Sequence, residues 1–179
     1  PINNENFKNI IQHPSYKRHS SIGYNFRMPE VCCAMGIAQL EKIDLLLSLR
    51  ERISMMYMDT ISDCKWLRGQ YISKNLKHSW WAFVFQILPE ETNINWDKFK
   101  IVFNKNGGDS FYGAWSLSYL EPALEGKEFK ENNITFKKGL CKIAESIQPH
   151  LIQLKTNYKT QEIMDSQVKA LKKTISELS

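Results

Sequence analysis

An amide and a guanidinium stand two residues apart in the short loop Gly23–Arg27, at Asn25 and Arg27. Both groups donate hydrogen bonds, and the fork of an arginine suits the oxygens of a phosphate or carboxylate. The loop leads to Pro29 and Glu30, which favour the first turn of a helix, and helix N-termini attract anions. The residues therefore predict an anion site. They leave open an alternative in which Asn25 caps a turn and Arg27 pairs with a surface acid.

Aromatic side chains later in the chain are weaker candidates for a ligand site. His78 precedes an aromatic run and could contact a substrate, although such a residue is more often a surface or capping residue. Four aromatic side chains could stack on a sugar ring or a nucleotide base. The alternative for each is a place in the core, where aromatic residues of strands are usually found. The four are Trp80, Trp81, Trp115 and Tyr119.

The acids, cysteines and histidines show no other catalytic or metal-binding pattern. Asp109 and Glu121 could act as an acid–base pair, but nothing in the sequence fixes their separation, and Asn106–Asp109 favours a turn. The four cysteines form no CxxC pair and the four histidines are scattered, unlike the ligands of a structural zinc site. We expect no metal, and reduced, buried thiols. The cysteines are Cys32, Cys33, Cys64 and Cys141.

The loop is followed by a stretch with the apolar spacing of a long helix. Apolar residues recur at steps of three and four from Val31 to Tyr57, which predicts one amphipathic helix over residues 29–61. A helix of about thirty residues is ~45 Å long, enough to join two lobes. A break near Leu45–Ser48 is the alternative.

Residues 62–179 show the mixture of strands and helices of a small α/β (α+β) domain. A short strand could begin at Lys65, and the aromatic and branched run Trp80–Leu88 predicts a buried strand. A helix is expected over Asn95–Asn104, with Asn95 as its cap.

The remaining elements are less regular. Residues 1–21 suggest an extended segment with at most one short helix near Asn6–Gln12, and Phe111–Tyr119 suggests a strand or an irregular binding surface. Residues 123–138 suggest a charged loop, and Leu140–Ile147 fits a short helix that ends before a proline. Thr160 is a suitable N-cap for a last amphipathic helix.

Residues 22–44, which run from Gly-Tyr-Asn-Phe-Arg-Met to Gln-Leu-Glu-Lys-Ile-Asp, resemble a segment of the DegT/StrS-type sugar aminotransferases. These are pyridoxal-phosphate (PLP) enzymes of fold type I, and the segment lies in the second half of their chains. Weaker similarity follows in the family's order at residues 79–85, 107–122 and 140–145, although Lys142 stands where a proline is expected.

The resemblance implies the C-terminal part of a fold type I PLP-dependent transferase, with a long linking helix and a small sheet covered by helices. Residues 1–28 would be a remnant of the large PLP-binding domain, 29–61 the linking helix, and 62–179 the small domain. We therefore expect a piece of a longer protein whose N-terminal half is missing here, and a homodimer with shared active sites.

The resemblance also implies roles for individual residues. Asn25 matches the asparagine that contacts the PLP phosphate of the neighbouring subunit, and Tyr24 and Arg27 match residues that line the shared cleft. Substrate contacts are expected from His78 and from three of the aromatic residues, Trp80, Trp115 and Tyr119. No lysine here has the context of the family's Schiff-base lysine, so the chain would contain no catalytic residue and should not transaminate alone.

The implied reaction transfers an amino group from an amino acid, with glutamate as the family's donor, to a nucleotide-linked keto-deoxysugar, as in perosamine synthases. The product would serve surface polysaccharide or lipopolysaccharide synthesis. One alternative is the dehydratase branch of the family, in which a histidine replaces the Schiff-base lysine. Another is a non-catalytic small domain that acts as a binding or assembly module.

Composition limits the partners of the 179-residue chain. Its 24 Lys and Arg exceed its 19 Asp and Glu, but the basic residues are spread out and form no nucleic-acid-binding motif. Mild basicity also suits a phosphorylated or nucleotide-linked small molecule. No apolar run approaches the ~18 residues of a membrane span, and the start has no signal-peptide pattern. We expect a soluble, cytoplasmic protein that binds neither nucleic acid nor membrane.

Overall fold

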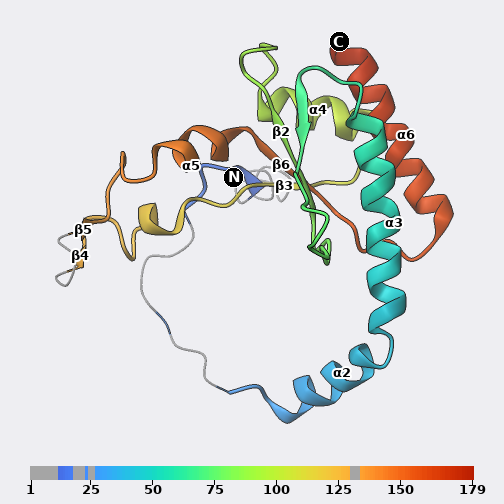
Figure 1. Ribbon diagram of the computed structural model, residues 1–179, viewed down its shortest axis with the longest axis horizontal. Helices are drawn as coiled ribbons and strands as arrows, with labels where there is room; N and C mark the ends of the chain where they lie inside the picture. The colour runs from blue at the N-terminus through green and yellow to red at the C-terminus, as the bar shows by residue number, and fades with distance from the viewer. Residues whose placement is uncertain (1–11, 18–22, 24–26, 130–133) are drawn as a thin grey trace, which may run out of the picture.

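The computed structural model describes residues 12–17, 23, 27–129 and 134–179. Its centre is a four-stranded antiparallel sheet with the strand order β1-β2-β6-β3 (Figure 1). Strand β6 comes late in the chain but pairs with β2 and β3 in the middle of the sheet. The strands are β1 Leu67–Gly69, β2 Phe83–Ile87, β3 Tyr112–Gly113 and β6 Leu151–Leu154.

Alternating side chains give the sheet one buried and one half-buried face. Phe83 and Phe85 of β2 are buried, while the residue between them is half-buried. Phe83 is opposite Leu154 and Phe85 is opposite Ile152, so the buried residues of the two strands share a face. The buried strand predicted over Trp80–Leu88 is confirmed, although β2 begins only at Phe83.

Three helices cover the buried face of the sheet: α3 (Ile43–Ile61), α4 (Trp96–Lys105) and α6 (Gln161–Leu178) (Figure 1). The Asn95 side chain caps α4 by accepting the N–H of the third helical residue at 2.9 Å. The Thr160 side chain caps α6 in the same way. Both predicted caps and their helices are confirmed.

Aromatic rings fill much of the core between the sheet and the helices. Phe99 stacks on Phe103 with 6.0 Å between ring centroids and meets Phe85 edge to face at 5.6 Å. Tyr57 of α3 contacts Phe83 at 5.4 Å. Burying such a ring stabilises a fold by about 1.5–3 kcal/mol relative to leaving it exposed, so this cluster accounts for much of the stability of the domain.

The expected single helix over residues 29–61 is two helices. α2 covers Glu30–Leu40, α3 follows two residues later, and the backbone leaves helical geometry at Lys42, with φ −116° and ψ 12°. The N–H of Lys42 bonds to the carbonyl of Gln39 at 3.1 Å, a three-residue step that ends α2. The prediction of one continuous helix is therefore wrong, and the alternative break near Leu45–Ser48 lies too far along the chain.

Helix α2 extends away from the sheet beyond the first turn of α3 (Figure 1). No residue of α2 is buried, and Leu40 is 63% exposed. The predicted apolar stripe reaches the core only in the second half of α3, at Ile53, Tyr57 and Ile61. The large exposed apolar residues in and around α2 are Met28, Val31, Met35, Ile37, Leu40, Ile43 and Leu45.

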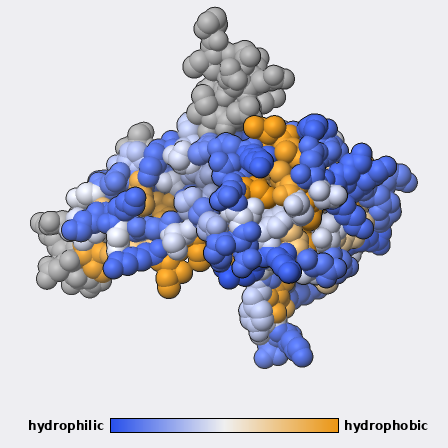
Figure 2. Space-filling model, turned by 90° about the horizontal axis from the view of Figure 1, so that it is seen from above, coloured by the Kyte–Doolittle hydropathy of each residue, from blue (hydrophilic) through white to orange (hydrophobic). Residues whose placement is uncertain are grey.

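On the face seen in Figure 2, hydrophobic residues form separate patches among hydrophilic ones. None of the helices in the described parts of the chain combines the length and the apolar composition that crossing a membrane requires.

The segment between β3 and α5 contains structure that the sequence did not predict. The expected charged loop over 123–138 includes a hairpin of β4 (Glu128–Phe129) and β5 (Ile134–Thr135), whose two-residue strands are too short to show an alternating pattern. Phe111–Tyr119 contains β3 followed by irregular backbone and the start of a 3₁₀ turn at Ser118–Leu120. A strand and irregular backbone therefore both occur there, and the role of the segment as a binding surface stays a prediction.

The short helix expected over Leu140–Ile147 is confirmed as α5 (Lys142–Ile147). A 3₁₀ turn at Gln148–His150 then leads directly into β6, one of the two inner strands of the sheet, which the sequence did not predict. The strand is only four residues long, includes the polar Gln153 and directly follows a 3₁₀ turn, so its sequence gives no independent signal of a strand.

Residues 12–17 pack against the domain that they precede by some fifty residues. Lys100 donates to the side chain of Gln12 at 2.5 Å, and Gln148 donates to the carbonyl of Pro14 at 2.8 Å. Burial lowers the pKa of Lys100, whose ammonium also lies 4.7 Å from the centre of the Trp96 ring. The short helix expected near Asn6–Gln12 lies almost wholly outside the described residues, and the division of the chain after residue 28 stays a prediction.

Candidate functional site

The predicted anion loop is described only in part. Tyr24 and Asn25, two of the three residues expected to bind the cofactor, lie outside the described residues. Arg27 is exposed and stands immediately before α2, where Pro29 is the N-cap and Glu30 the first helical residue. A guanidinium beside a helix N-terminus suits an anion, but the role of this loop stays a prediction.

His78 holds the backbone of the next tryptophan. Its Nδ1 accepts the N–H of Trp80 at 2.9 Å, and its ring lies 4.3 Å from the Trp80 ring. Trp80 has a left-handed backbone with φ 51°, which is unfavourable for a bulky residue. The indole of Trp80 is 3% exposed and packs on Phe83 at 5.9 Å. The substrate role predicted for these two residues stays a prediction, while the contacts that the structure gives them are structural ones.

A cavity of about 610 Å³ adjoins His78 and Trp80, between α3 and the segment before β2. Met55 and Met58 of α3 line it together with Lys74 and Lys77. Its walls mix apolar, basic and acidic side chains and give no clear preference for one ligand.

The hydroxyl of Tyr119 ties the 3₁₀ turn to the start of α5. It donates to Glu145 Oε1 at 2.5 Å, and the same carboxylate accepts the backbone N–H groups of Gly139, at 2.8 and 2.9 Å, and Cys141, at 3.2 Å. Desolvation and this hydrogen bond raise the pKa of Tyr119 to about 12, while the Tyr119 hydroxyl lowers the pKa of Glu145. The substrate contact expected of Tyr119 stays a prediction.

A second cavity, of about 350 Å³, lies where α3, the segment before β2 and the segment after β6 meet. Trp81 and Trp115 stand at it with their rings 6.5 Å apart and nearly perpendicular. Both are accessible, Trp81 being 69% and Trp115 52% exposed. We call this cavity the tryptophan pocket; it is lined by Arg50, Trp81, Ala82, Phe111, Tyr112, Trp115, Gln153, Leu154, Lys155 and Asn157.

Arg50 brings a half-buried positive charge to the tryptophan pocket. Its Nη1 donates to the carbonyl of Trp81 at 3.0 Å and to Oγ1 of Thr156 at 2.9 Å. Thr156 is fully buried, and its hydroxyl donates to the carbonyl of Trp80 at 2.6 Å. These bonds fix Arg50 against neutral groups, and within the described residues it has no carboxylate partner.

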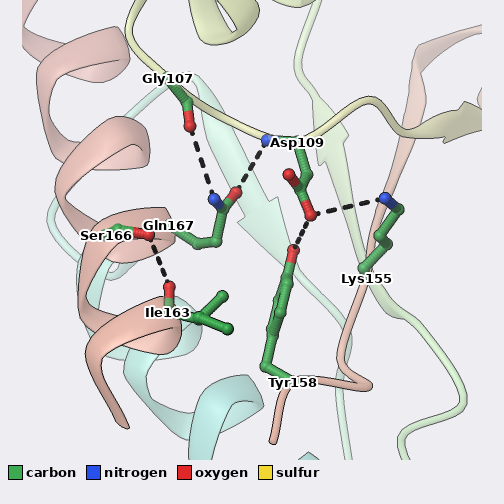
Figure 3. A network of polar contacts seen from close by, with 7 residues as sticks. All are labelled: Gly107, Asp109, Lys155, Tyr158, Ile163, Ser166 and Gln167. Carbon is green, nitrogen blue, oxygen red and sulfur yellow. Dashed lines mark hydrogen bonds and ion pairs between the residues drawn. The ribbon is translucent and has the colours of Figure 1, made fainter. Parts of the chain in front are cut away.

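Lys155 brings a second positive charge, which a polar network holds in place (Figure 3). Its ammonium lies 3.4 Å from Asp109 Oδ2, which also accepts the Tyr158 hydroxyl at 3.1 Å. The Asp109 backbone N–H donates to the Gln167 side chain of α6 at 2.8 Å. Asp109 is thus an ion-pair residue that follows the turn at Asn106 and Gly107, and its role as half of an acid–base pair with Glu121 stays a prediction.

Sequence and structure select different sets of residues. Of the four predicted substrate residues, only Trp115 lines the tryptophan pocket, because His78 and Trp80 lie at the larger cavity. The sequence missed Arg50 and Lys155. A signal existed for Arg50, since a charged residue interrupts the apolar stripe of α3 three positions before Ile53; Lys155 follows a strand that was itself not predicted.

The expectation of buried thiols is corrected by the structure. All four cysteines are free, and Cys32, Cys33 and Cys141 are exposed, because α2 and the start of α5 contribute nothing to the core. Cys64 is half-buried, and burial raises the pKa of its thiol. The described residues contain no group of three side chains that could hold a metal ion.

Residues 4–170 match the model of the DegT/DnrJ/EryC1/StrS aminotransferase family. The chain belongs to this family. The GDP-perosamine synthase of Vibrio cholerae is 27% identical over 125 residues, which cover 68% of this chain and 34% of that protein. Members of the family depend on PLP.

Two solved structures share the fold. PseC of Helicobacter pylori, an aminotransferase of pseudoaminic acid biosynthesis, superposes with a TM-score of 0.62 at 19% identity over 97% of this chain and 46% of PseC. The GDP-4-keto-6-deoxy-D-mannose-3-dehydratase of E coli, solved with hydrated PLP, gives 0.57 at 20% identity over 83% of this chain and 36% of that chain. The fold is therefore that of the C-terminal part of a fold type I PLP-dependent transferase, as predicted, and the chain spans less than half of these relatives.

Proposed function

We propose that this chain is the C-terminal half of a PLP-dependent aminotransferase that acts on a nucleotide-linked keto-deoxysugar. The observation that carries the proposal is the family match over residues 4–170, which includes both the predicted anion loop and the tryptophan pocket. The relative named GDP-perosamine synthase supports a nucleotide-linked keto sugar as the acceptor. Glutamate is the proposed donor, and the product would enter surface polysaccharide or lipopolysaccharide synthesis in the cytoplasm.

The residues of this chain would act on the cofactor through its phosphate. PLP, when bound, supplies an electron sink for the amino transfer. Arg27 is exposed at the start of a helix, which fits an anionic group, and Asn25 and Tyr24 precede it in sequence. In the proposed homodimer, Asn25 donates to the phosphate held by the partner subunit, and Tyr24 and Arg27 line the shared cleft.

The small domain would bind the sugar nucleotide and exclude water from the cleft. The half-buried face of its sheet lies opposite the helices, and the tryptophan pocket opens there between β3 and the segment after β6. His78, Trp80, Trp115 and Tyr119 remain the proposed substrate-side residues, and Trp115 is the one with the greatest accessible surface among them. Closure over substrate is the usual way in which such domains exclude water.

A dehydratase is the second candidate, because a 3-dehydratase of GDP-4-keto-6-deoxymannose shares the fold over 83% of this chain. Both reactions would use the same PLP-binding loop and the same class of substrate. They differ in a residue of the half that this chain does not include, so the chain itself favours neither.

The proposal is tested on the chain joined to the sequence that precedes Pro1 in its gene. With PLP, glutamate and GDP-4-keto-6-deoxymannose, we expect a product in which an amino group replaces the keto oxygen, detected by mass spectrometry. The 179-residue chain alone should give no product. A product that has lost a hydroxyl group would select the dehydratase, and a joined protein that binds PLP and converts no keto sugar would contradict the proposed function.

A further inference from the structure

We propose that the tryptophan pocket is the binding site for the nucleoside diphosphate part of the substrate, with Trp81 and Trp115 against the base and Arg50 and Lys155 against the diphosphate. The inference rests on the proposed function, because it takes a nucleotide-linked sugar as the substrate. It adds a binding site and a division of labour among four residues. The sequence offered Trp81 and Trp115 as candidates for stacking, and only Trp115 as an expected substrate contact.

The two indoles give the pocket an accessible aromatic wall. Trp81 and Trp115 are 69% and 52% exposed, although large apolar side chains usually avoid water in a folded domain. Their rings are inclined at 77°, so a flat base can stack on one indole while its edge meets the other. Every nucleotide base has a flat π face that can stack on an aromatic side chain, which makes exposed indoles suitable base platforms.

Two cations stand at the same cavity. Arg50 is half-buried, and all the hydrogen bonds that the structure gives it within the described residues leave from Nη1. Its Nη2 and Nε groups therefore have no described partner, and a guanidinium fork is the protein group best matched to phosphate oxygens. Lys155 has a single described carboxylate partner at 3.4 Å and retains donors for a second anion.

Asp109 positions Lys155 for this task. Its carboxylate is fixed by the Tyr158 hydroxyl and its backbone by Gln167, so the ion pair anchors the ammonium at the pocket (Figure 3). Desolvation, followed by the nearby hydroxyl of Tyr57 and the Asp109 carboxylate, raises the pKa of Tyr158, which keeps its hydroxyl a donor to Asp109. Asp109 is a positioning residue in this account and does not touch the ligand.

Amide groups complete the pocket on the sheet side. Gln153 projects from the half-buried face of β6, and Asn157 follows three residues after the strand. Neither side-chain amide has a hydrogen-bond partner among the described residues. An amide offers both donors and an acceptor, the combination that the edge of a base requires.

PLP and a nucleotide both combine an aromatic ring with phosphate. The geometry of the tryptophan pocket favours the nucleotide. The pocket has two cations, which match the two phosphates of a nucleoside diphosphate, whereas PLP has one. Its volume of about 350 Å³ is within the usual range for small-molecule sites. Arg27, the residue of the predicted cofactor-binding loop that the structure describes, does not line this pocket.

The experiment titrates the 179-residue chain with UDP, GDP, uridine and PLP, following tryptophan fluorescence and calorimetry. We expect UDP or GDP to bind, uridine to bind at least about tenfold more weakly, and the affinity to fall as salt is added. Lys155→Gln and Trp81→Ala should each lower the affinity for the nucleoside diphosphate by about tenfold or more. Arg50→Lys tests the contribution of the Arg50 guanidinium to diphosphate binding. Because Arg50 also bonds to backbone carbonyls, circular dichroism is used to check that this variant folds.

Matched controls exist on other surfaces. Lys105 forms a similar exposed ion pair with Glu177 at 2.6 Å, so Lys105→Gln should leave nucleotide affinity unchanged. Tyr71 is 89% exposed, and Tyr71→Ala should also have no effect. Equal losses in Lys105→Gln and Lys155→Gln would mean a non-specific charge effect and would overturn the proposed site.

The outcomes separate this site from the proposed function. Absence of nucleotide binding, or PLP binding that competes with UDP and is lost in Trp81→Ala, would overturn the nucleotide site. In the joined protein, Lys155→Gln should raise KM for the sugar nucleotide about tenfold and leave kcat nearly unchanged. Amino transfer with an unchanged KM in Lys155→Gln would overturn the nucleotide site and leave the proposed function standing. Nucleotide binding without amino transfer would overturn the proposed function and leave the nucleotide site standing.

Discussion

Helices α2 and α6 show that apolar composition and burial are separate properties. α2 is the more apolar in sequence, yet none of its residues is buried, while the more polar α6 buries Met164, Val168 and Leu171 on one stripe. In α6 the apolar residues recur at steps of three and four and face the sheet. In α2 they surround the helix, as expected of a helix that is covered from more than one side. Within the described residues, α6 contributes to the core of the domain, whereas α2 leaves its apolar side chains exposed.

The largest difference should appear when the same substitution, leucine to alanine, is made in each helix. Leu171 is fully buried and Leu40 is 63% exposed. Leu171→Ala should lower the free energy of unfolding by about 2–5 kcal/mol, since it leaves a cavity in the core. Leu40→Ala should change it by less than about 0.5 kcal/mol. Urea denaturation followed by circular dichroism measures both, and equal losses would mean that α2 packs inside this chain.

The surface of α2 should be detectable with a hydrophobic dye. Val31 and Met35 are large and exposed, so the 179-residue chain should bind a dye such as ANS, and Val31→Lys with Met35→Lys should reduce that binding severalfold. Ile163→Lys on the exposed part of α6 is the control and should have a smaller effect. A wild-type chain that binds no dye would contradict the assignment of α2 as an uncovered surface.

The N-terminal caps of α6 and α2 should differ in their contribution to stability, by less than the leucine substitutions do. The Thr160 side chain caps α6, whereas Pro29 at the start of α2 makes no side-chain cap. Thr160→Ala should cost about 1 kcal/mol of stability, and Pro29→Ala should cost little. Thr160→Ser, which keeps the hydroxyl, should restore most of the loss. If Thr160→Ala melts like the wild type, the cap is not formed in solution.

The smallest effect should depend on pH through Glu177 of α6. Its hydrogen bonds with Lys105 and Asn106 hold the pKa of the Glu177 carboxyl below its ordinary value. The stability that this gives is complete above the ordinary glutamate pKa and is lost as pH falls through the lower pKa of the folded state. Lys105→Gln should therefore lower the melting temperature slightly at neutral pH and converge with the wild type in acid. A constant difference at every pH would contradict this origin.

Local signals predicted a large part of the fold. Asn95 and Thr160 marked the starts of α4 and α6 because a cap and the first turn are adjacent in sequence. The run before Pro89 marked β2, since its aromatic and branched residues are typical of a buried strand. The break at Lys42 was placed wrongly, because the apolar spacing continues past Lys42 without interruption. The sequence does not show that only the residues of α3 reach the core.

The missed elements depend on contacts between distant segments. β6 becomes a strand because β2 and β3 flank it, and both pairings join residues far apart in the chain. Arg50 and Lys155 line one cavity only once β6, which Lys155 directly follows, is in place. Trp81 and Trp115 could both be selected from the sequence as candidates for stacking, but only the tertiary structure groups them with each other and with the two cations.

The most direct test of the central claim is PLP retention by the chain joined to the sequence that precedes Pro1, measured by the absorbance of bound PLP after dialysis. The account predicts that the joined protein retains PLP and that Asn25→Ala weakens retention at least about tenfold while melting normally, because one donor to a charged phosphate is removed. Asn93→Ala, at an exposed position of the small domain, is the control. Equal PLP retention by Asn25→Ala, Asn93→Ala and the wild type would contradict the claim that this chain contributes to a coenzyme site.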